Sequence, residues 1–173
     1  MSARAMQLSI TSIGLLSAWL GASLLVAAVV APAAFAVLPT RTLAGALVGR
    51  VLPVLFWSGI ALGVAVAFLG SQLNLGKIGI GAAIVFAAAC AVAQFGIAPR
   101  IEALRAAIGG PVDALDVGDP RRMAFGRMHG MSVLLMGIGM VAALVALIIL
   151  ARHLSSPSVH VGQSNHEMIG ASR

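Results

Sequence analysis

Charged residues are scarce in this chain. They make up 9% of its 173 residues, whereas 60% of the residues are apolar. An ordinary soluble domain carries about 25% charged residues. A soluble globule of this size could not cover its surface with so few charges, so that class is excluded. The composition indicates an integral membrane protein with several spans, whose main surroundings are the lipid bilayer.

Acidic residues and cysteine are rarer still. Five Asp and Glu face eleven Lys and Arg, which gives a net charge of +6. Long apolar runs separate the basic residues, so the charge pattern excludes a nucleic-acid-binding surface. Cys90 is the single cysteine and lies inside an apolar run, which excludes an intramolecular disulfide.

Titratable side chains are rare in the middle of the apolar stretches, where membrane enzymes and transporters need them. Neither acids nor Lys or Arg occur in the centres of the apolar stretches, where Gln94 and Cys90 are the main polar side chains. Ion-coupled transporters place ionisable residues at that depth. No Ser-His-Asp, HExxH or CxxC pattern is present. We therefore predict that the protein is not an enzyme, with no catalytic, cofactor-binding or metal-binding residues and no cofactor.

Four apolar stretches reach the length of about 20 residues that a membrane span needs. They cover about residues 8–38, 41–69, 77–98 and 120–153. We expect an all-α, polytopic fold, a four-transmembrane-helix bundle in one domain of residues 1–153. Residues 99–119 form its extramembrane segment, and residues 154–173 form a polar C-terminal tail.

The distribution of positive charge predicts the orientation. With four spans, the termini and the second loop share one side, which holds Arg4, Lys77, Arg152 and Arg173. The other seven basic residues lie in the first and third loops. Positive charge prefers the cytoplasm, so we predict a protein of the bacterial inner membrane with both termini on the non-cytoplasmic side.

Small residues recur at four-residue spacing in every span, and Gly59 and Gly63 form a GxxxG pair. Such stripes let helices approach closely. Two interpretations are compatible: tight packing inside the bundle, or docking against a neighbouring subunit. We choose Gly59 and Gly63 as the docking stripe, with the polar tail contacting another chain.

The densest polar cluster lies at the predicted cytoplasmic edge. The structural or interaction candidates there are Arg100, Glu102, Arg105, Arg127, His129 and Ser132. Glu102 is expected to pair with an arginine of a neighbouring helix. The arginines are also suited to the phosphate of an anionic lipid.

Five of the eight methionines occur in the fourth span. Together with His129 and Cys90 they suggest an alternative, a path for a soft metal such as Cu(I). Methionine is also an ordinary gap-filler in helical cores.

Three segments resemble a known family. They read APAAFAVL from Ala31, IAPRIEALR from Ile97 and FGRMHGMS from Phe125. In this order they are similar to small four-span membrane proteins of unknown function, a family that includes the eukaryotic transmembrane protein implicated in cisplatin resistance. The resemblance implies a four-helix bundle without assigned catalytic activity. It singles out Pro99, Arg100, Arg105, Phe125, His129 and Ser132.

Two functions follow as expectations. The first is a non-catalytic accessory or structural subunit of a larger membrane complex, respiratory or photosynthetic, with other membrane protein subunits as partners. The alternative is a membrane protein that handles a small solute or a soft metal.

Overall fold

The first long helix runs from Ala3 to Val37 in three consecutive segments of the computed structural model, which describes residues 3–155. These segments are α1 (Ala3–Leu25), the π-helical η1 (Val26–Val30) and α2 (Ala31–Val37). A short turn leads to α3 (Arg41–Gln72), which begins at Thr40 because the Thr40 side chain accepts a hydrogen bond from the backbone N–H of Leu43 at 3.2 Å.

The third long helix is also continuous, from α4 (Gly76–Ala91) through the π-helical η2 (Val92–Ile97) to α5 (Ala98–Ile108). It ends at Gly109, whose φ of +67° lies in the left-handed region that glycine adopts without strain. A loop with one short turn, η3 (Val112–Ala114), leads to α6 (Pro120–Ser155). Asp119 caps α6, since its carboxylate accepts from the backbone N–H of Arg121 at 2.8 Å.

Both π-helical segments precede a proline. Pro32 and Pro99 have no N–H to donate to the carbonyl four residues earlier, and their rings would clash with it. Just before them, the backbone N–H of Ala31 donates to Val26 and that of Ala98 to Ala93, five residues back in each case. The wider turns keep both helices hydrogen-bonded through the prolines.

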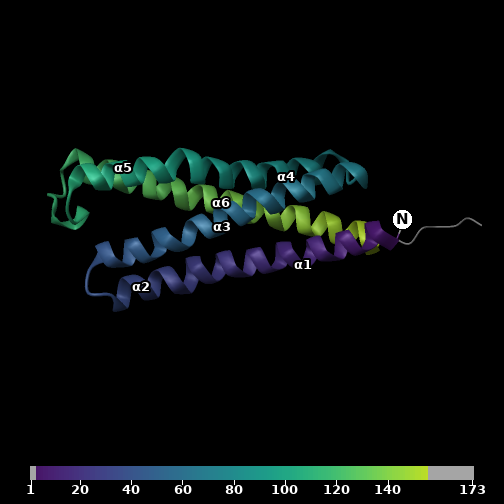
Figure 1. Ribbon diagram of the computed structural model, residues 1–173, viewed down its shortest axis with the longest axis horizontal. Coiled ribbons are helices and arrows are strands. Elements are labelled where there is room, and N and C mark those ends of the chain that lie inside the picture. Colours follow the sequence, from purple (N-terminus) through teal and green to yellow (C-terminus); the bar gives the residue numbers. More distant parts are fainter. Residues whose placement is uncertain (1–2, 156–173) are drawn as a thin grey trace, which may run out of the picture.

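In the described part of the chain, four helices are long and apolar enough to cross a membrane (Figure 1). They form a ring in which α1 packs on α3, α3 on α4, α4 on α6, and α6 on α1. The structure therefore confirms the predicted all-α, four-helix membrane fold. Residues 156–173, which include most of the predicted polar tail, lie outside the described residues.

The core is built around Trp19 of α1. Its ring packs edge-on against Phe86 at 4.5 Å between centroids, and its indole N–H donates to the Leu55 carbonyl at 2.9 Å. A Cβ at Gly59 would lie 2.6 Å from the Cys90 sulfur and 3.2 Å from the Trp19 ring. The absent side chain of Gly59 thus makes room for the centre of the core.

The choice of Gly59 and Gly63 as an outward docking stripe is wrong. Both glycines are buried, and a Cβ at Gly63 would lie 2.9 Å from the backbone nitrogen of Ala87. The pair is used for close packing of α3 on α4, which is the other interpretation of the stripe. Leucine at both positions would disrupt the bundle itself rather than release it from a partner.

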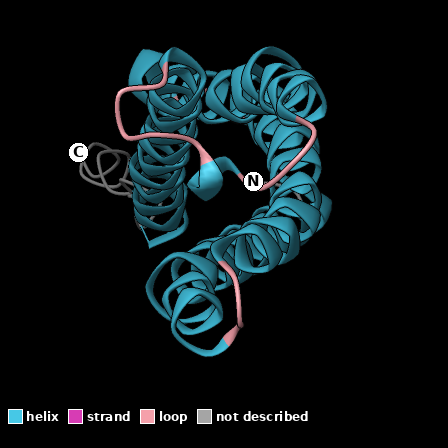
Figure 2. Cartoon of the chain, turned by 90° about the vertical axis from the view of Figure 1, so that its left-hand side faces the viewer, coloured by secondary structure: helices cyan, strands magenta, loops and turns pink. Residues whose placement is uncertain are grey.

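The ring is open at the end where the α2–α3 and α5–α6 loops lie. Here α2 packs on α3, while α5 packs on α6, and the two pairs spread apart (Figure 1). Viewed from this end, the η3 loop folds over the space between the helices (Figure 2), where η3 contacts both α3 and α6. The Arg122 guanidinium fastens this loop by donating to the Leu115 carbonyl at 2.8 Å.

Candidate functional site: a cavity at the loop end

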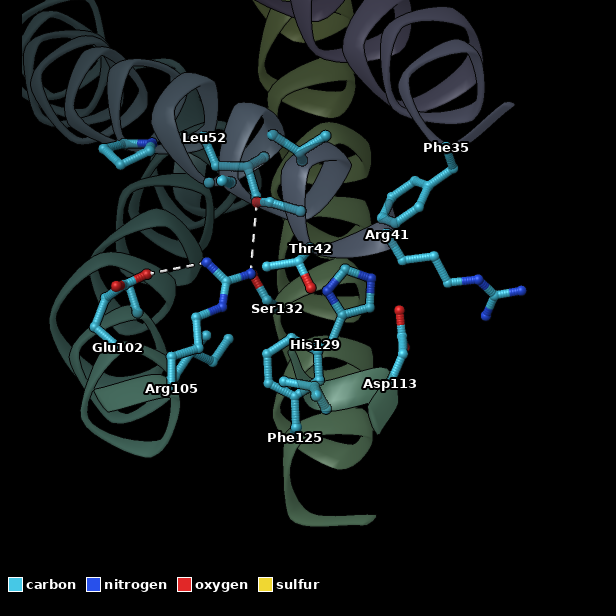
Figure 3. A pocket seen from close by; sticks show the side chains of 18 of the residues that line it. Phe35, Arg41, Thr42, Leu52, Glu102, Arg105, Asp113, Phe125, His129 and Ser132 are labelled. Atoms are coloured by element: carbon cyan, nitrogen blue, oxygen red, sulfur yellow. Dashed lines mark hydrogen bonds and ion pairs between the residues drawn. The ribbon is translucent and has the colours of Figure 1, made fainter. Parts of the chain in front are cut away.

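A cavity of about 490 Å³ occupies the space between the two spread helix pairs (Figure 3). Its volume lies in the range of pockets that hold small molecules, about 300–1,000 Å³. Apolar side chains from α2, α3, α5, α6 and the η3 loop form most of its wall: Phe35, Val48, Leu52, Pro53, Phe56, Ile101, Val112 and Phe125.

Arg105 of α5 brings a positive charge against this apolar wall. Its side chain is 29% exposed. The guanidinium donates to the Gly45 carbonyl at 3.5 Å and to a Glu102 carboxylate oxygen at 3.4 Å. Both contacts are longer than ordinary N–H···O bonds of about 2.7–3.2 Å. A guanidinium has five N–H donors, so Arg105 can also donate to a ligand.

Two glycines of α3 make room for this guanidinium. A Cβ at Gly45 would lie 3.1 Å from one terminal nitrogen of Arg105, and a Cβ at Gly49 would lie 3.5 Å from the other. Sequence reasoning missed this pair, although Gly45 and Gly49 form a second GxxxG. The pattern is present in the sequence, but it does not tell which side chain of another helix will lie against the two glycines.

Three residues of α6 face the same cavity. Phe125, His129 and Ser132 follow one another at spacings of four and three, which places them on one side of a helix. The guanidinium carbon of Arg105 lies 5.3 Å from the centre of the Phe125 ring, a cation–π contact. The His129 ring is parallel to that of Phe125 within 3°, with 6.4 Å between centroids. The Phe125 ring therefore packs against the guanidinium of Arg105 from the α6 side of the cavity (Figure 3).

Glu102 pairs with an arginine, as predicted, and the correction concerns the helix from which that arginine comes. Its arginine partner is Arg105, three residues along the same helix, and not an arginine of a neighbouring helix. The Glu102 side chain is 68% exposed, so water already stabilises its charge. Residues three or four apart lie side by side on one helix without any tertiary contact. Arg105 is therefore nearer to Glu102 than an arginine of another helix.

The structure divides the predicted cluster. Glu102, Arg105, His129 and Ser132 line the cavity, and Arg41, Thr42 and Asp113, which were not among the candidates, join them. Arg41 extends away from Arg105, toward the opposite side of the cavity, with Asp113 nearby (Figure 3). Arg100 and Arg127 are exposed and line no part of it. Four of the six residues that the family resemblance implied, Arg105, Phe125, His129 and Ser132, meet here.

Cys90 and Met136, two of the sulfur-bearing residues of the soft-metal alternative, belong to a different part of the bundle from His129. Met136 and Cys90 are buried in the core around Trp19, whereas His129 lies at the cavity. Met123 and Met131 are exposed by 46% and 51%. Within residues 3–155, three or more His, Cys, Asp or Glu side chains nowhere gather as they would around a metal ion.

The cavity combines the inward-facing Arg105 guanidinium, a second guanidinium from Arg41, the carboxylates of Glu102 and Asp113, an imidazole and two hydroxyl-bearing side chains with a largely apolar wall. Such a combination suits a small amphiphile whose acidic group meets Arg105 and whose apolar part lies against Leu52 and Phe56.

Comparison with known proteins adds a family. Residues 14–109 match a domain of unknown function, DUF4149. The match covers more than half of the chain and includes Gly45, Gly49, Glu102 and Arg105, whereas Phe125, His129 and Ser132 lie beyond it. No curated protein and no solved structure matches the chain. The likeness to the family with the cisplatin-resistance protein therefore stays a prediction. The chain, whose described part has four helices long and apolar enough to cross a membrane, belongs to the DUF4149 family of unknown function.

Proposed function

We propose that this protein is a non-catalytic integral membrane protein that binds a small amphiphile with an acidic head group in the loop-end cavity. This develops the small-solute alternative of the sequence analysis. The position of Arg105 is the observation that supports it, because the guanidinium lies against an apolar wall and its two hydrogen bonds to residues 3–155 are both long.

The head group must provide most of the affinity. An apolar chain gains little by moving from lipid into the cavity, since the hydrocarbon of the bilayer is equally apolar. A hydrogen bond between charged groups contributes about 1.5–3 kcal/mol. That free energy corresponds to a factor of about 10–150 in affinity, which predicts selection for the acid over a neutral molecule of the same length.

Dodecanoate and dodecanol test this selection, because they share a chain and differ in the head group. We expect dodecanoate to raise the thermal unfolding midpoint of the protein in a non-ionic detergent, and dodecanol to leave it nearly unchanged. Arg105→Gln should weaken dodecanoate binding by about tenfold or more. Arg100→Gln is the matched control, since it removes an exposed charge from the same helix outside the cavity.

A second variant tests whether the apolar chain of the ligand lies in the cavity. Leu52→Trp fills the cavity without removing a charge, and should also weaken dodecanoate binding. Equal effects of the acid and the alcohol, or equal losses in Arg105→Gln and Arg100→Gln, would contradict the proposal.

An accessory subunit of a larger membrane complex is the second candidate. Its support is an outward stripe on α6, formed by Gly126, Gly130 and Gly137. All three are exposed, no atom lies within 4 Å of a Cβ placed on any of them, and their spacing puts them on one face. They replace Gly59 and Gly63 as the docking stripe, while the predicted contact of the tail lies outside the described residues.

Gentle solubilisation followed by native mass measurement tests this second function. A complex with other chains that is lost in the Gly126→Leu/Gly130→Leu variant would support a subunit. Gly14→Leu, also open but on α1, serves as the control. A lone 17.5 kDa chain or a simple homodimer would count against it.

A further inference from the structure

A second hollow, about 630 Å³ in volume, lies between α3 and the η2–α5 segment. Six of its ten lining residues also line the cavity described above: Ala46, Gly49, Pro53, Ala98, Glu102 and Arg105. Arg50, Gln94, Phe95 and Pro99 line the second hollow alone. It therefore adjoins the cavity along these shared residues, and its other four residues can be changed without altering the lining of the cavity.

The second hollow offers both donors and acceptors of hydrogen bonds. Arg50 and Arg105 contribute guanidinium groups. On the acceptor side is the Glu102 carboxylate. Gln94 adds a side-chain oxygen that has no hydrogen-bond partner within the described residues and is covered by protein atoms, so this side chain must turn toward the hollow before a ligand can reach it. A buried acceptor without a partner costs free energy, so a donor on a ligand would be favoured beside Gln94.

Aromatic side chains indicate the depth of this hollow. Trp57 of α3 and Phe95 of η2 are both more than half exposed and pack edge-on, with 5.1 Å between ring centroids. Exposed tryptophan is enriched where the membrane meets water. Arg50 and Glu102 each lie seven residues from this pair, about 10 Å along their helices. The hollow thus lies between charged side chains and lipid-facing aromatic ones, where a lipid head group would lie.

We propose that the second hollow binds the head group of a zwitterionic phospholipid that carries a primary ammonium, as in phosphatidylethanolamine. The phosphate accepts from the guanidinium groups of Arg50 and Arg105. The ammonium donates to the Glu102 carboxylate and, once the Gln94 side chain turns toward the hollow, to the side-chain oxygen of Gln94. The trimethylated ammonium of phosphatidylcholine has no N–H to donate, and the head group of phosphatidylglycerol has no cation. Neither lipid can therefore make the hydrogen bonds from the ammonium. The ligand differs from the acidic amphiphile of the proposed function.

Native mass measurement with added lipid tests the specificity. Phosphatidylethanolamine, phosphatidylcholine and phosphatidylglycerol with identical acyl chains are added in turn to the delipidated protein. We expect phosphatidylethanolamine to be retained about threefold or more above the other two, as the extra hydrogen bonds predict. Stronger retention of phosphatidylglycerol would instead support the anionic lipid that the sequence analysis expected, and would overturn this proposal.

Two variants test the residues. Gln94→Leu removes the buried acceptor at similar size, and Arg50→Gln removes a phosphate contact. Each should lower phosphatidylethanolamine retention about threefold or more and bring it close to that of phosphatidylcholine. Arg100→Gln, an exposed arginine at the same end that lines neither hollow, should leave it unchanged. Unchanged selectivity in Gln94→Leu and Arg50→Gln would overturn the proposal.

The two proposals can fail separately. Gln94 and Arg50 do not line the first cavity, so their variants should bind dodecanoate like the unchanged protein. His129→Leu should have no effect on phosphatidylethanolamine, because His129 does not line the second hollow. The thermal unfolding midpoint of each variant reports whether it is folded, independently of either ligand.

Discussion

Glycines decide how closely the helices of this bundle approach one another. The nearest neighbours of Gly59, the Cys90 sulfur and the Trp19 ring, leave no room for a methyl group. Gly59→Ala should therefore destabilise the protein by about 1–3 kcal/mol, the usual cost of overpacking a core. The midpoint of unfolding in a mild detergent measures this change.

Gly14→Ala is the matched control for that prediction. Gly14 lies inside α1, and nothing lies within 4 Å of the added methyl group. Alanine is a better helix former than glycine by about 1 kcal/mol, so this variant should be neutral or slightly stabilising. A similar loss of stability in both variants would mean that the close contacts of Gly59 are not the cause of the destabilisation.

Asp119 makes the start of α6 sensitive to pH. Hydrogen bonds from the side chain and the backbone of Arg121 lower the pKa of the Asp119 carboxyl below its ordinary value of 3.8. A lowered pKa means that the folded state favours the charged carboxylate. The resulting stability is present above the ordinary pKa and is lost as the pH falls through the lowered pKa.

Asp119→Ala should therefore lower the unfolding midpoint at pH 6, and the difference from the unchanged protein should shrink below about pH 4. Thermal unfolding in detergent across this pH range measures it. Asp116→Ala is the control, since Asp116 lies three residues earlier in the same loop. A difference that stays constant from pH 6 to pH 3 would refute the role of the carboxylate.

At the scale of helices, Pro99 determines which side of α5 faces the cavity. The π-helical turn before it widens the helix by one residue, so it determines the direction in which Glu102 and Arg105 point. Pro99→Ala allows a regular α-helix, which would rotate α5 relative to α4. We expect dodecanoate binding to weaken several-fold while the unfolding midpoint is unchanged or raised, because alanine removes a helix-breaking residue.

Pro32→Ala provides the comparison for this prediction. Pro32 also follows a π-helical turn, but it lies on α2 and does not line the cavity. A smaller loss of dodecanoate binding is expected there. Equal binding by Pro99→Ala and the unchanged protein would show that the π-helical turn of the third helix does not position Arg105.

The sequence was sufficient to predict the helices, and insufficient to predict their contacts. Long apolar runs, the Asp119-Pro120 start and the Gly109 stop predict the helices and many of their ends, because these signals are local. The inward direction of Gly59 and Gly63 depends on which helix lies beside them. The partner of Glu102, and the meeting of Arg105 with Gly45, separated by 60 residues, likewise depend on the assembled bundle.

For the whole molecule, positive charge in the first and third loops predicts that both termini lie outside the cytoplasm. Cys90 is buried, so an introduced cysteine can be labelled selectively. In spheroplasts, a membrane-impermeant maleimide should label Ser164→Cys and spare Asp116→Cys until the membrane is opened. The reverse pattern would place the cavity on the non-cytoplasmic side.

The central claim is that the loop-end cavity holds an acidic amphiphile with its head at Arg105. A dodecanoate analogue with a photoreactive diazirine at the end of the chain tests this most directly. After illumination, the adducts should lie on cavity residues such as Leu52 and Phe56, and Arg105→Gln should reduce their yield about tenfold or more when the analogue is not saturating. Adducts that lie mainly on lipid-facing residues of the same helix, such as Val54 and Phe68, and persist in Arg105→Gln would contradict the account.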